Sequence, residues 1–403
     1  GPVGRTPQGE GAPAPAAAVQ AAEKDEEGTR AISDAVAKLL GNLRVRGYTQ
    51  LRYNRWLHHF GLMNPQFVNE QGDRSIGENN GFMIRRARLI LFGDVHPLVS
   101  IYFQPDFANT IGDVTHIVIL RDWYADLFLT ESKQLRFRVG QSKVPFGFEN
   151  MQSSQNRLPL DRNDALNSAV KDERDLGVFF YAETTEARRR FKLLVDEGLK
   201  GSGDYGVFGF GAYNGQTANR RDLNDNFHWV ARLAYPFQIG GQFIEPGIAA
   251  YTGRYVIKKD KGVGGPDEFQ DRRAQVQFVL YPQPFGIQAE YNVGTGPQYE
   301  LDGAARTPTV RQGFLHGGYV VVSWRFKELG VIPFARGTMY DGGKKFETNA
   351  PRYHVREVEA GVEWQVFKNL ELTGTYLTGV RTNPQSGRDE FGRVLRMQLQ
   401  VNY

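Results

Sequence analysis

Apolar and polar positions alternate along nearly the whole chain, and the alternation is clearest in its last segment. In FGRVLRMQLQVNY (391–403), single polar residues separate Leu395, Met397 and Leu399. Because successive side chains of a strand point to opposite faces, this segment has one apolar face and one polar face. Alternating segments of about ten residues are typical of transmembrane β-barrels, and an aromatic last residue fits their interfacial girdles.

The same alternation recurs often enough to build a closed barrel. We predict an all-β fold, a transmembrane antiparallel β-barrel of about 16 strands, in which short turns alternate with long loops. Short turns belong on the periplasmic side of such barrels, and an even strand number then places both termini in the periplasm. The predicted strands are 42–53, 82–93, 98–107, 115–129, 134–142, 174–182, 206–213, 227–236, 243–253, 272–281, 284–294, 314–326, 330–341, 353–366, 369–380 and 391–403.

Two segments depart from the strand pattern. Residues 1–20 are rich in Gly, Pro and Ala without periodicity, and apolar residues at helical spacing follow between 29 and 40. We therefore divide the chain into a periplasmic tether with a short amphipathic helix (1–41) and the barrel (42–403). The helix could rest on the barrel rim, plug the lumen or oligomerise. Residues 183–205 are too long for a periplasmic turn, and we expect an extra hairpin element there that extends below the membrane.

The period of two also assigns side chains to the lipid or to the lumen. Three strands direct pairs of arginines inward: Arg44 and Arg46, Arg86 and Arg88, and Arg136 and Arg138. The predicted inward acids gather on 353–371. A lumen divided in this way would favour anions along its basic wall. Alternatively, the arginines and glutamates pair across the water and only set the shape of the barrel.

Composition removes several other classes of protein. The 403 residues include no run close to the roughly 18 apolar residues of a membrane helix, and there is no cysteine. His58 and His59 lack an obvious third ligand, so we predict no metal and no cofactor. No Ser/His/Asp arrangement gathers at one rim, so we do not expect an enzyme. The net charge of +4 is small, and we expect no nucleic-acid partner.

One long connection follows the strand 134–142. Pro145 and Gly147 mark a sharp departure from the strand, and no new strand begins until after Glu173. Because side chains alone cannot fill a barrel of this width, we expect the loop 143–173 to fold inward and narrow the channel. The alternative is a surface loop that makes contacts only outside the barrel.

Three motifs resemble a known family. RFRVGQSKVPFGFENMQSSQN (136–156), RDLGVFFY (174–181) and AYNG (212–215) are similar to the porin O and P family of bacterial outer-membrane proteins, whose best-known members are phosphate- and polyphosphate-selective porins. The resemblance implies a homotrimer of sixteen-stranded barrels, each with a basic constriction made by an inward loop. It implies that Lys143, Pro145, Phe146 and Gly147 start this loop. The loop also carries Asp161, Asp164, Asp172 and Glu173, which departs from the lysine- and arginine-rich loops of phosphate-specific members.

We therefore predict an outer-membrane porin for passive diffusion of small hydrophilic solutes, with a preference for phosphate-like or carboxylate anions. Its partners would be outer-membrane lipid and lipopolysaccharide, small anionic solutes and further copies of the chain. The alternative is an occluded barrel that attaches to an external or cell-wall partner. The residues predicted to set selectivity at the constriction are Lys143, Arg136, Arg138, Arg157, Arg162, Arg44, Arg46, Arg86 and Arg88.

Overall fold

The regular structure is almost entirely β-strand. The computed structural model describes residues 41–57, 81–111, 114–383 and 388–403. The strands are β1 (Leu43–Trp56), β2 (Gly81–His96), β3 (Val99–Ile111), β4 (Val114–Phe128), β5 (Leu135–Lys143), β6 (Arg174–Ala182), β7 (Phe208–Tyr213), β8 (His228–Ala234), β9 (Phe237–Ile239), β10 (Gln242–Val256), β11 (Glu268–Leu280), β12 (Phe285–Asp302), β13 (Thr307–Trp324), β14 (Val331–Gly343), β15 (Arg352–Phe367), β16 (Leu370–Asn383) and β17 (Arg388–Asn402). The helices are α2 (Phe148–Met151), α3 (Asp164–Asn167), α4 (Thr185–Asp196) and the 3-10 turns η2 (Lys171–Glu173) and η3 (Lys327–Leu329).

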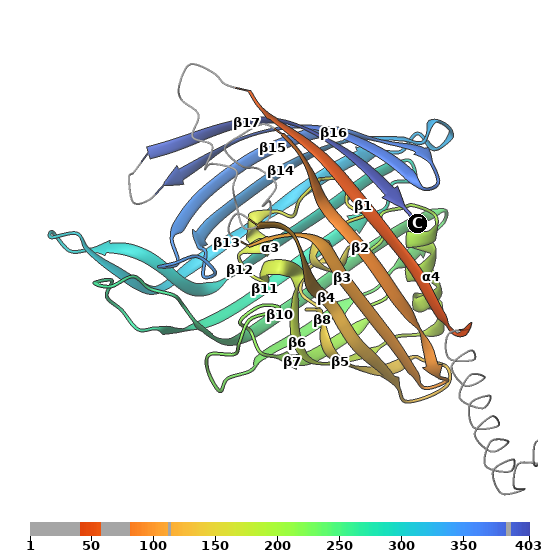
Figure 1. The fold of residues 1–403 in the computed structure, drawn as a ribbon, viewed down its shortest axis with the longest axis horizontal. Helices are drawn as coiled ribbons and strands as arrows, with labels where there is room; N and C mark the ends of the chain where they lie inside the picture. The colour runs from red at the N-terminus through yellow and green to blue at the C-terminus, as the bar shows by residue number, and fades with distance from the viewer. Residues whose placement is uncertain (1–40, 58–80, 112–113, 384–387) are drawn as a thin grey trace, which may run out of the picture.

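These strands close into a barrel. Every neighbouring pair is antiparallel, and β1 pairs with β17 from Tyr48↔Asn402 to Trp56↔Val394 (Figure 1). The seventeen segments occupy sixteen wall positions, because β8 and β9 both pair with β10 as successive pieces of one strand. The predicted sixteen-stranded antiparallel transmembrane barrel is confirmed. The predicted tether and helix within 1–40 lie outside the described residues. Among the helices that are described, none has the length and apolar character needed to cross a membrane.

Side chains alternate between the two faces of the wall as the sequence pattern requires. On β11, Val276 and Phe278 are 54% and 43% exposed on the outer face, whereas Gln275 and Gln277 are buried on the inner face. The exposed rings of Trp324, Trp364 and Tyr403 lie at the ends of their strands next to the short turns, where an aromatic girdle belongs.

The segment 183–205 is not the predicted hairpin but a helix followed by an irregular stretch that folds inward. Ala187, Phe191 and Leu194 recur at helical spacing and are buried, and the Thr184 hydroxyl caps α4 by accepting from the Ala187 amide at 3.1 Å. Helical spacing at these positions excludes the period of two that a hairpin needs. The helix lies at the same end of the barrel as the C-terminus (Figure 1).

The stretch after α4 enters the barrel rather than hanging below it. Leu199 is buried against Phe243 and Tyr281 of the wall, and Lys200 pairs with Glu363 on β15. The Gln152 amide also donates to the Lys200 carbonyl at 2.7 Å. This inward turn (residues 183–205) therefore touches the loop 143–173 from the end of the lumen that carries the short turns.

Candidate channel constriction

The loop 143–173 lies inside the barrel, where its apolar residues pack against the wall. Val144, Phe146 and Leu166 join wall residues such as Phe179 and Tyr251 in one buried cluster. The Phe146 ring meets the Tyr251 ring edge-on, with 4.9 Å between centroids. A polar-looking loop is thus held inside the lumen by a small hydrophobic core of its own.

The start of the loop is fixed by a carboxylate on β12. Glu290 accepts from the backbone amides of Phe148 and Glu149 at 2.8 and 2.6 Å, which are the free donors at the start of α2. Gly147, just before, has φ 84° and ψ 148°, a conformation open almost only to glycine. A Cβ at this position would lie 2.7 Å from Glu290 Oε2 and 2.8 Å from Leu166 Cδ2. Gly147 is therefore required both for its backbone angles and for the close approach.

Two wall arginines, on β14 and β11, also hold the loop. Arg336 on β14 donates to the Asp161 carbonyl at 2.7 Å and pairs with Glu149 at 3.4 Å. Arg273 on β11 donates to the Ser168 hydroxyl and carbonyl oxygens at 2.8 and 2.9 Å. β11, which carries Arg273, lies across the barrel from β1 and β2, so the loop spans the lumen.

On the β1–β2 side, the loop offers one carboxylate to four arginines. Asp161 pairs with Arg52 at 2.7 Å, with Arg85 at 3.2 Å, with Arg86 at 3.6 Å and also with Arg396. Burial alone would raise the pKa of Asp161, but these arginines outweigh burial and hold the pKa well below its usual range. Asp161 is therefore an anion throughout the neutral range, and it orders the arginines around it (the Asp161 cluster).

A second carboxylate orders the cations at the end of the loop. Glu173 pairs with Arg157, with Arg162 at 3.4 Å, with Lys143 at 3.6 Å and with Arg174 at 2.5 Å. Burial would raise the pKa of Glu173, but these cations outweigh burial and keep the pKa well below its usual range. Burial lowers the pKa of Arg162 to about 10, which leaves this guanidinium charged at neutral pH.

Between the loop and the strands β1, β2, β3 and β4 lies a cavity of about 540 Å³. Two carboxylates, Asp172 and Glu173, share its lining with seven guanidinium groups, and Asp161 and Asp106 pair with these arginines from behind. Seven cations against four anions leave a positive excess. The Nε of Arg157 is a buried donor without a hydrogen-bond partner in the described part of the chain. The seven arginines of this arginine cavity are Arg52, Arg85, Arg86, Arg88, Arg121, Arg157 and Arg162.

Hydrogen bonds fix the arginines of the cavity in place. Arg88 donates to Asp106 at 2.8 Å and to the Tyr48 hydroxyl at 2.7 Å, and Arg86 donates to the Gln50 amide oxygen at 2.7 Å. Guanidinium groups held in this way present planar pairs of donors, which match phosphate and carboxylate oxygens.

The structure gathers four of the nine predicted selectivity residues in this cavity, namely Arg86, Arg88, Arg157 and Arg162. Lys143 instead donates to the Met151 and Gln152 carbonyls at 3.1 and 2.7 Å, so it braces the loop.

The remaining predicted arginines lie elsewhere on the wall. Arg138 forms two 2.8 Å hydrogen bonds with Asp126, and Arg136 pairs with Glu183 at 2.9 Å and with Asp204 at 3.1 Å. Arg44 and Arg46 lie near the start of β1, where their side chains are exposed, and they do not line the cavity.

Three arginines of the cavity, Arg52, Arg85 and Arg121, were not among the predicted selectivity residues, and the last two of them sit at strand irregularities. The register of β1 against β2 shifts between Gln50 and Leu51, and the shift turns both Arg85 and Arg86 toward Asp161. On β4, Asp122 and Leu120 pair with consecutive residues of β3, so Arg121 is the extra residue of a bulge. The broken alternation at Arg121 was a sequence signal of the second irregularity.

The fold matches solved outer-membrane channels at low sequence identity. The chain is similar to the outer-membrane channel DcaP of Acinetobacter baumannii (TM-score 0.58, 11% identity, 90% of this chain and 97% of that chain). It is also similar to Salmonella typhi OmpF (TM-score 0.57, 12% identity, 90% and 98%). An anion-selective porin from Comamonas acidovorans matches with a TM-score of 0.51 and 10% identity over 90% and 99% of the two chains. No curated protein matches the chain significantly.

A closed sixteen-stranded barrel with a charged, loop-narrowed lumen, in a chain that matches a porin family, defines an outer-membrane channel of the porin class. The family profile described as "Phosphate-selective porin O and P" matches residues 66–403. The chain therefore belongs to this family, and the resemblance carried by its sequence motifs is confirmed.

Proposed function

We propose that the chain is a passive outer-membrane porin that prefers small anions, with the arginine cavity as its selectivity site. The observation that carries this proposal is that, among the described residues, seven guanidinium groups line one cavity beside the loop 143–173, against two carboxylates in its lining and two behind it. A buried constriction amplifies the effect of each charge on a passing ion. The family and the named anion-selective porin support the same preference.

Phosphate-like and carboxylate anions are the best candidates among small anions. The cavity arginines are held in fixed orientations, and Arg157 Nε is a donor still to be satisfied. Phosphate or pyrophosphate that binds there should block the current of smaller ions, whereas a general anion pore would show no such block. The fold and the charged lumen support a channel rather than an enzyme.

The test is the double substitution Arg86→Gln and Arg88→Gln. In this variant Asp106 still has its ion pair with Arg121 at 3.5 Å, and Asp161 still has its ion pair with Arg52 at 2.7 Å. Neither carboxylate is therefore left without a cation. The ratio of chloride to potassium permeability should fall by at least roughly thirty-fold, because each lost charge removes about 1 kcal/mol of attraction for chloride at contact distance in water, about 2 kcal/mol in total.

The matched control removes the same number of charges at the mouth of the barrel. Arg44→Gln with Arg46→Gln should change the permeability ratio much less, because both side chains are exposed outside the cavity. Equal effects of the two double variants would refute the assignment of selectivity to the arginine cavity.

One observation favours a second candidate, an occluded barrel with an attachment role. The loop 143–173 and the inward turn 183–205 enter the lumen together and contact each other between Gln152 and Lys200. If the full-length protein fails to conduct and deletion of residues 1–40 does not restore conductance, the described barrel itself is closed. Conductance of the full-length protein would exclude this candidate.

We further propose the assembly and orientation that a porin of this family would have. Three copies would form a trimer, with the short turns and both termini in the periplasm and the outer wall against lipid and lipopolysaccharide. Chemical cross-linking of the purified protein tests the trimer. Protease access to tags at the two termini in intact cells tests the orientation.

A further inference from the structure

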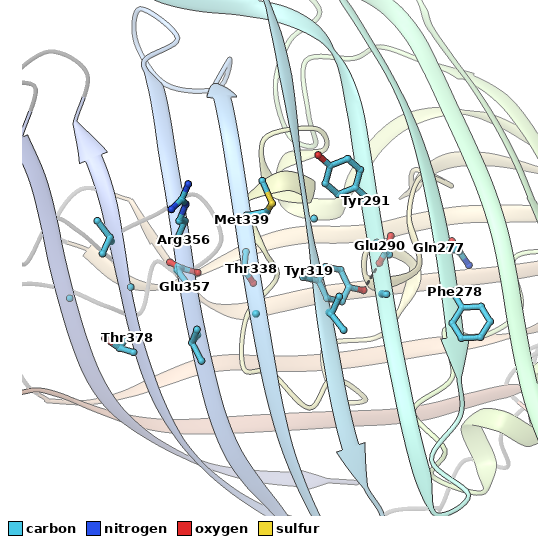
Figure 2. Close-up of a pocket in the computed structure, with 18 of the residues that line it drawn as sticks. Gln277, Phe278, Glu290, Tyr291, Tyr319, Thr338, Met339, Arg356, Glu357 and Thr378 are labelled. Carbon is cyan, nitrogen blue, oxygen red and sulfur yellow. Dashed lines mark hydrogen bonds between the residues drawn. The ribbon is translucent and has the colours of Figure 1, made fainter.

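The outer wall of the barrel carries an apolar groove that the channel function does not use. The groove has a volume of about 1110 Å³ and runs across the wall from β11 to β17. This volume is as large as that of the largest small-molecule pockets of proteins, which reach about 1,000 Å³. Figure 2 shows Tyr291, Met339 and Arg356 at one level on β12, β14 and β15, with Phe278 on β11. Its exposed apolar lining comprises Val276, Phe278, Tyr291, Val320, Met339, Val358 and Phe391.

Glycines on the outer face make the floor of the groove. A Cβ at Gly318 would lie 2.1 Å from the Glu290 carbonyl, so this position accepts no larger residue. Gly337 is exposed, and a Cβ there would meet nothing within 4 Å. The space above Gly337 is thus open to an occupant from outside, and a larger side chain could fill it without a clash.

Two outward arginines, Arg356 and Arg393, complete the lining. Both are exposed, and in the described part of the chain neither has a hydrogen bond or ion pair from its side chain. Strand pairing places Arg356 opposite Val380, which pairs with Phe391, two residues from Arg393. At a strand spacing of about 4.8 Å, the two Cα atoms lie roughly 12 Å apart. Two flexible arginines at that separation can reach one phosphorylated headgroup together.

The height of these arginines on the wall matches a headgroup and not the membrane centre. Along β15, Arg356 lies eight residues from the girdle residue Trp364. In a tilted strand this separation corresponds to a rise of about 20 Å. Arg393 lies ten residues from the girdle residue Tyr403, which places it about 25 Å from Tyr403 along the membrane normal. Since the apolar band is about 25 Å tall, Arg393 lies at its edge at the end with the long loops, and the long side chain of Arg356 covers the roughly 5 Å that remain. An arginine near the interface costs little, whereas one at the midplane destabilises the barrel.

We propose that this groove binds lipopolysaccharide of the outer leaflet, with acyl chains over Gly337 and Val358, which pair two residues below Arg356, and phosphate groups on Arg356 and Arg393. In the described part of the chain, the groove has an apolar surface below two cations that have no protein partners. This arrangement is complementary to an amphiphile with several acyl chains and an anionic headgroup. The proposal rests on the outer-membrane orientation given above but not on ion selectivity.

The experiment measures binding of fluorescently labelled lipopolysaccharide to the full-length protein in neutral detergent micelles by anisotropy. Arg356→Gln with Arg393→Gln should weaken binding by roughly thirty-fold. Removal of the phosphates from the lipopolysaccharide should weaken binding to the wild type to a similar degree. Gly337→Leu should weaken binding by filling the groove while leaving both arginines in place. The matched control is Arg272→Gln, an exposed outward arginine of β11 that does not line the groove.

Three results would overturn the proposal. The first is unchanged binding in the double variant, or an equal loss in Arg272→Gln. The second is equal affinity for an anionic glycerophospholipid, which would make the site a general phosphate contact. The third is loss of the oligomer in Gly337→Leu with lipopolysaccharide binding unchanged, which would make the groove a subunit interface. Single-channel conductance of the same variants should equal the wild-type value, so failure of the channel proposal would be seen separately.

Discussion

Substitution of Gly147 by alanine should release the loop 143–173 from the lumen without disrupting the barrel. The residue has φ 84° and ψ 148°, and forcing alanine into this region costs about 1–3 kcal/mol. The new Cβ would also lie 2.7 Å from Glu290 Oε2, which binds the Phe148 and Glu149 amides. The strain alone multiplies the ratio of undocked to docked loop by roughly 5 to 150. Displacement of Glu290 would add to this factor.

Single-channel recording is the assay for this release. In the variant, openings of larger conductance should become more frequent, because the loop no longer fills the lumen. Limited proteolysis should also cut within 143–173, while the barrel keeps its resistance to heat in detergent. Gly374→Ala is the control, because a Cβ there meets nothing within 4 Å and the backbone needs no left-handed angle. Wild-type conductance and protease resistance in Gly147→Ala would refute the idea that this contact anchors the loop.

Three further predictions concern charges in the lumen. Asp161→Asn removes the carboxylate at the centre of the Asp161 cluster, so phosphate should block the channel at roughly tenfold lower concentration; an unchanged blocking concentration would mean that anions do not reach this cluster. Burial and the nearby Asp204 raise the pKa of Glu183 to about 8, above the usual value of about 4.3. The stabilisation of the inward turn by protonated Glu183 is therefore complete below the usual pKa and lost as pH rises from there through about 8, so hydrogen exchange in 183–205 should increase more between about pH 5 and 8 in the wild type than in Glu183→Gln. Lys200→Met leaves the buried charge of Glu363 without its cation and should destabilise the inward turn by about 3 kcal/mol, seen as faster exchange in 183–205; exchange at the wild-type rate would show that this pair does not hold the turn.

The strand pattern predicted the barrel because the side chain of each wall residue faces either lipid or the aqueous lumen and must have the matching polarity. That requirement acts residue by residue, so it is visible in a single sequence, as in the inward placement of Arg86 and Arg88. The same local rule fails where the wall has an extra residue. Arg85 faces Asp161 only because the register shifts beside it.

The partners of the lumen charges could not be predicted, because they are set by contacts between distant segments. Arg138 and Arg86 look alike in the sequence, yet Arg138 is bound to Asp126 on the neighbouring strand, while Arg86 meets Asp161 of the loop. Helical spacing in 185–196 was a readable signal for α4, but nothing local shows that Lys200 reaches Glu363.

The most direct test of the account is the reversal potential of the full-length protein in planar bilayers under a tenfold gradient of potassium chloride. If the arginine cavity controls the pathway, the reversal potential will have the sign of chloride preference, and added phosphate will reduce the current. A reversal potential with the sign of potassium preference would contradict the central claim that the positive excess beside the loop 143–173 selects the ions that pass.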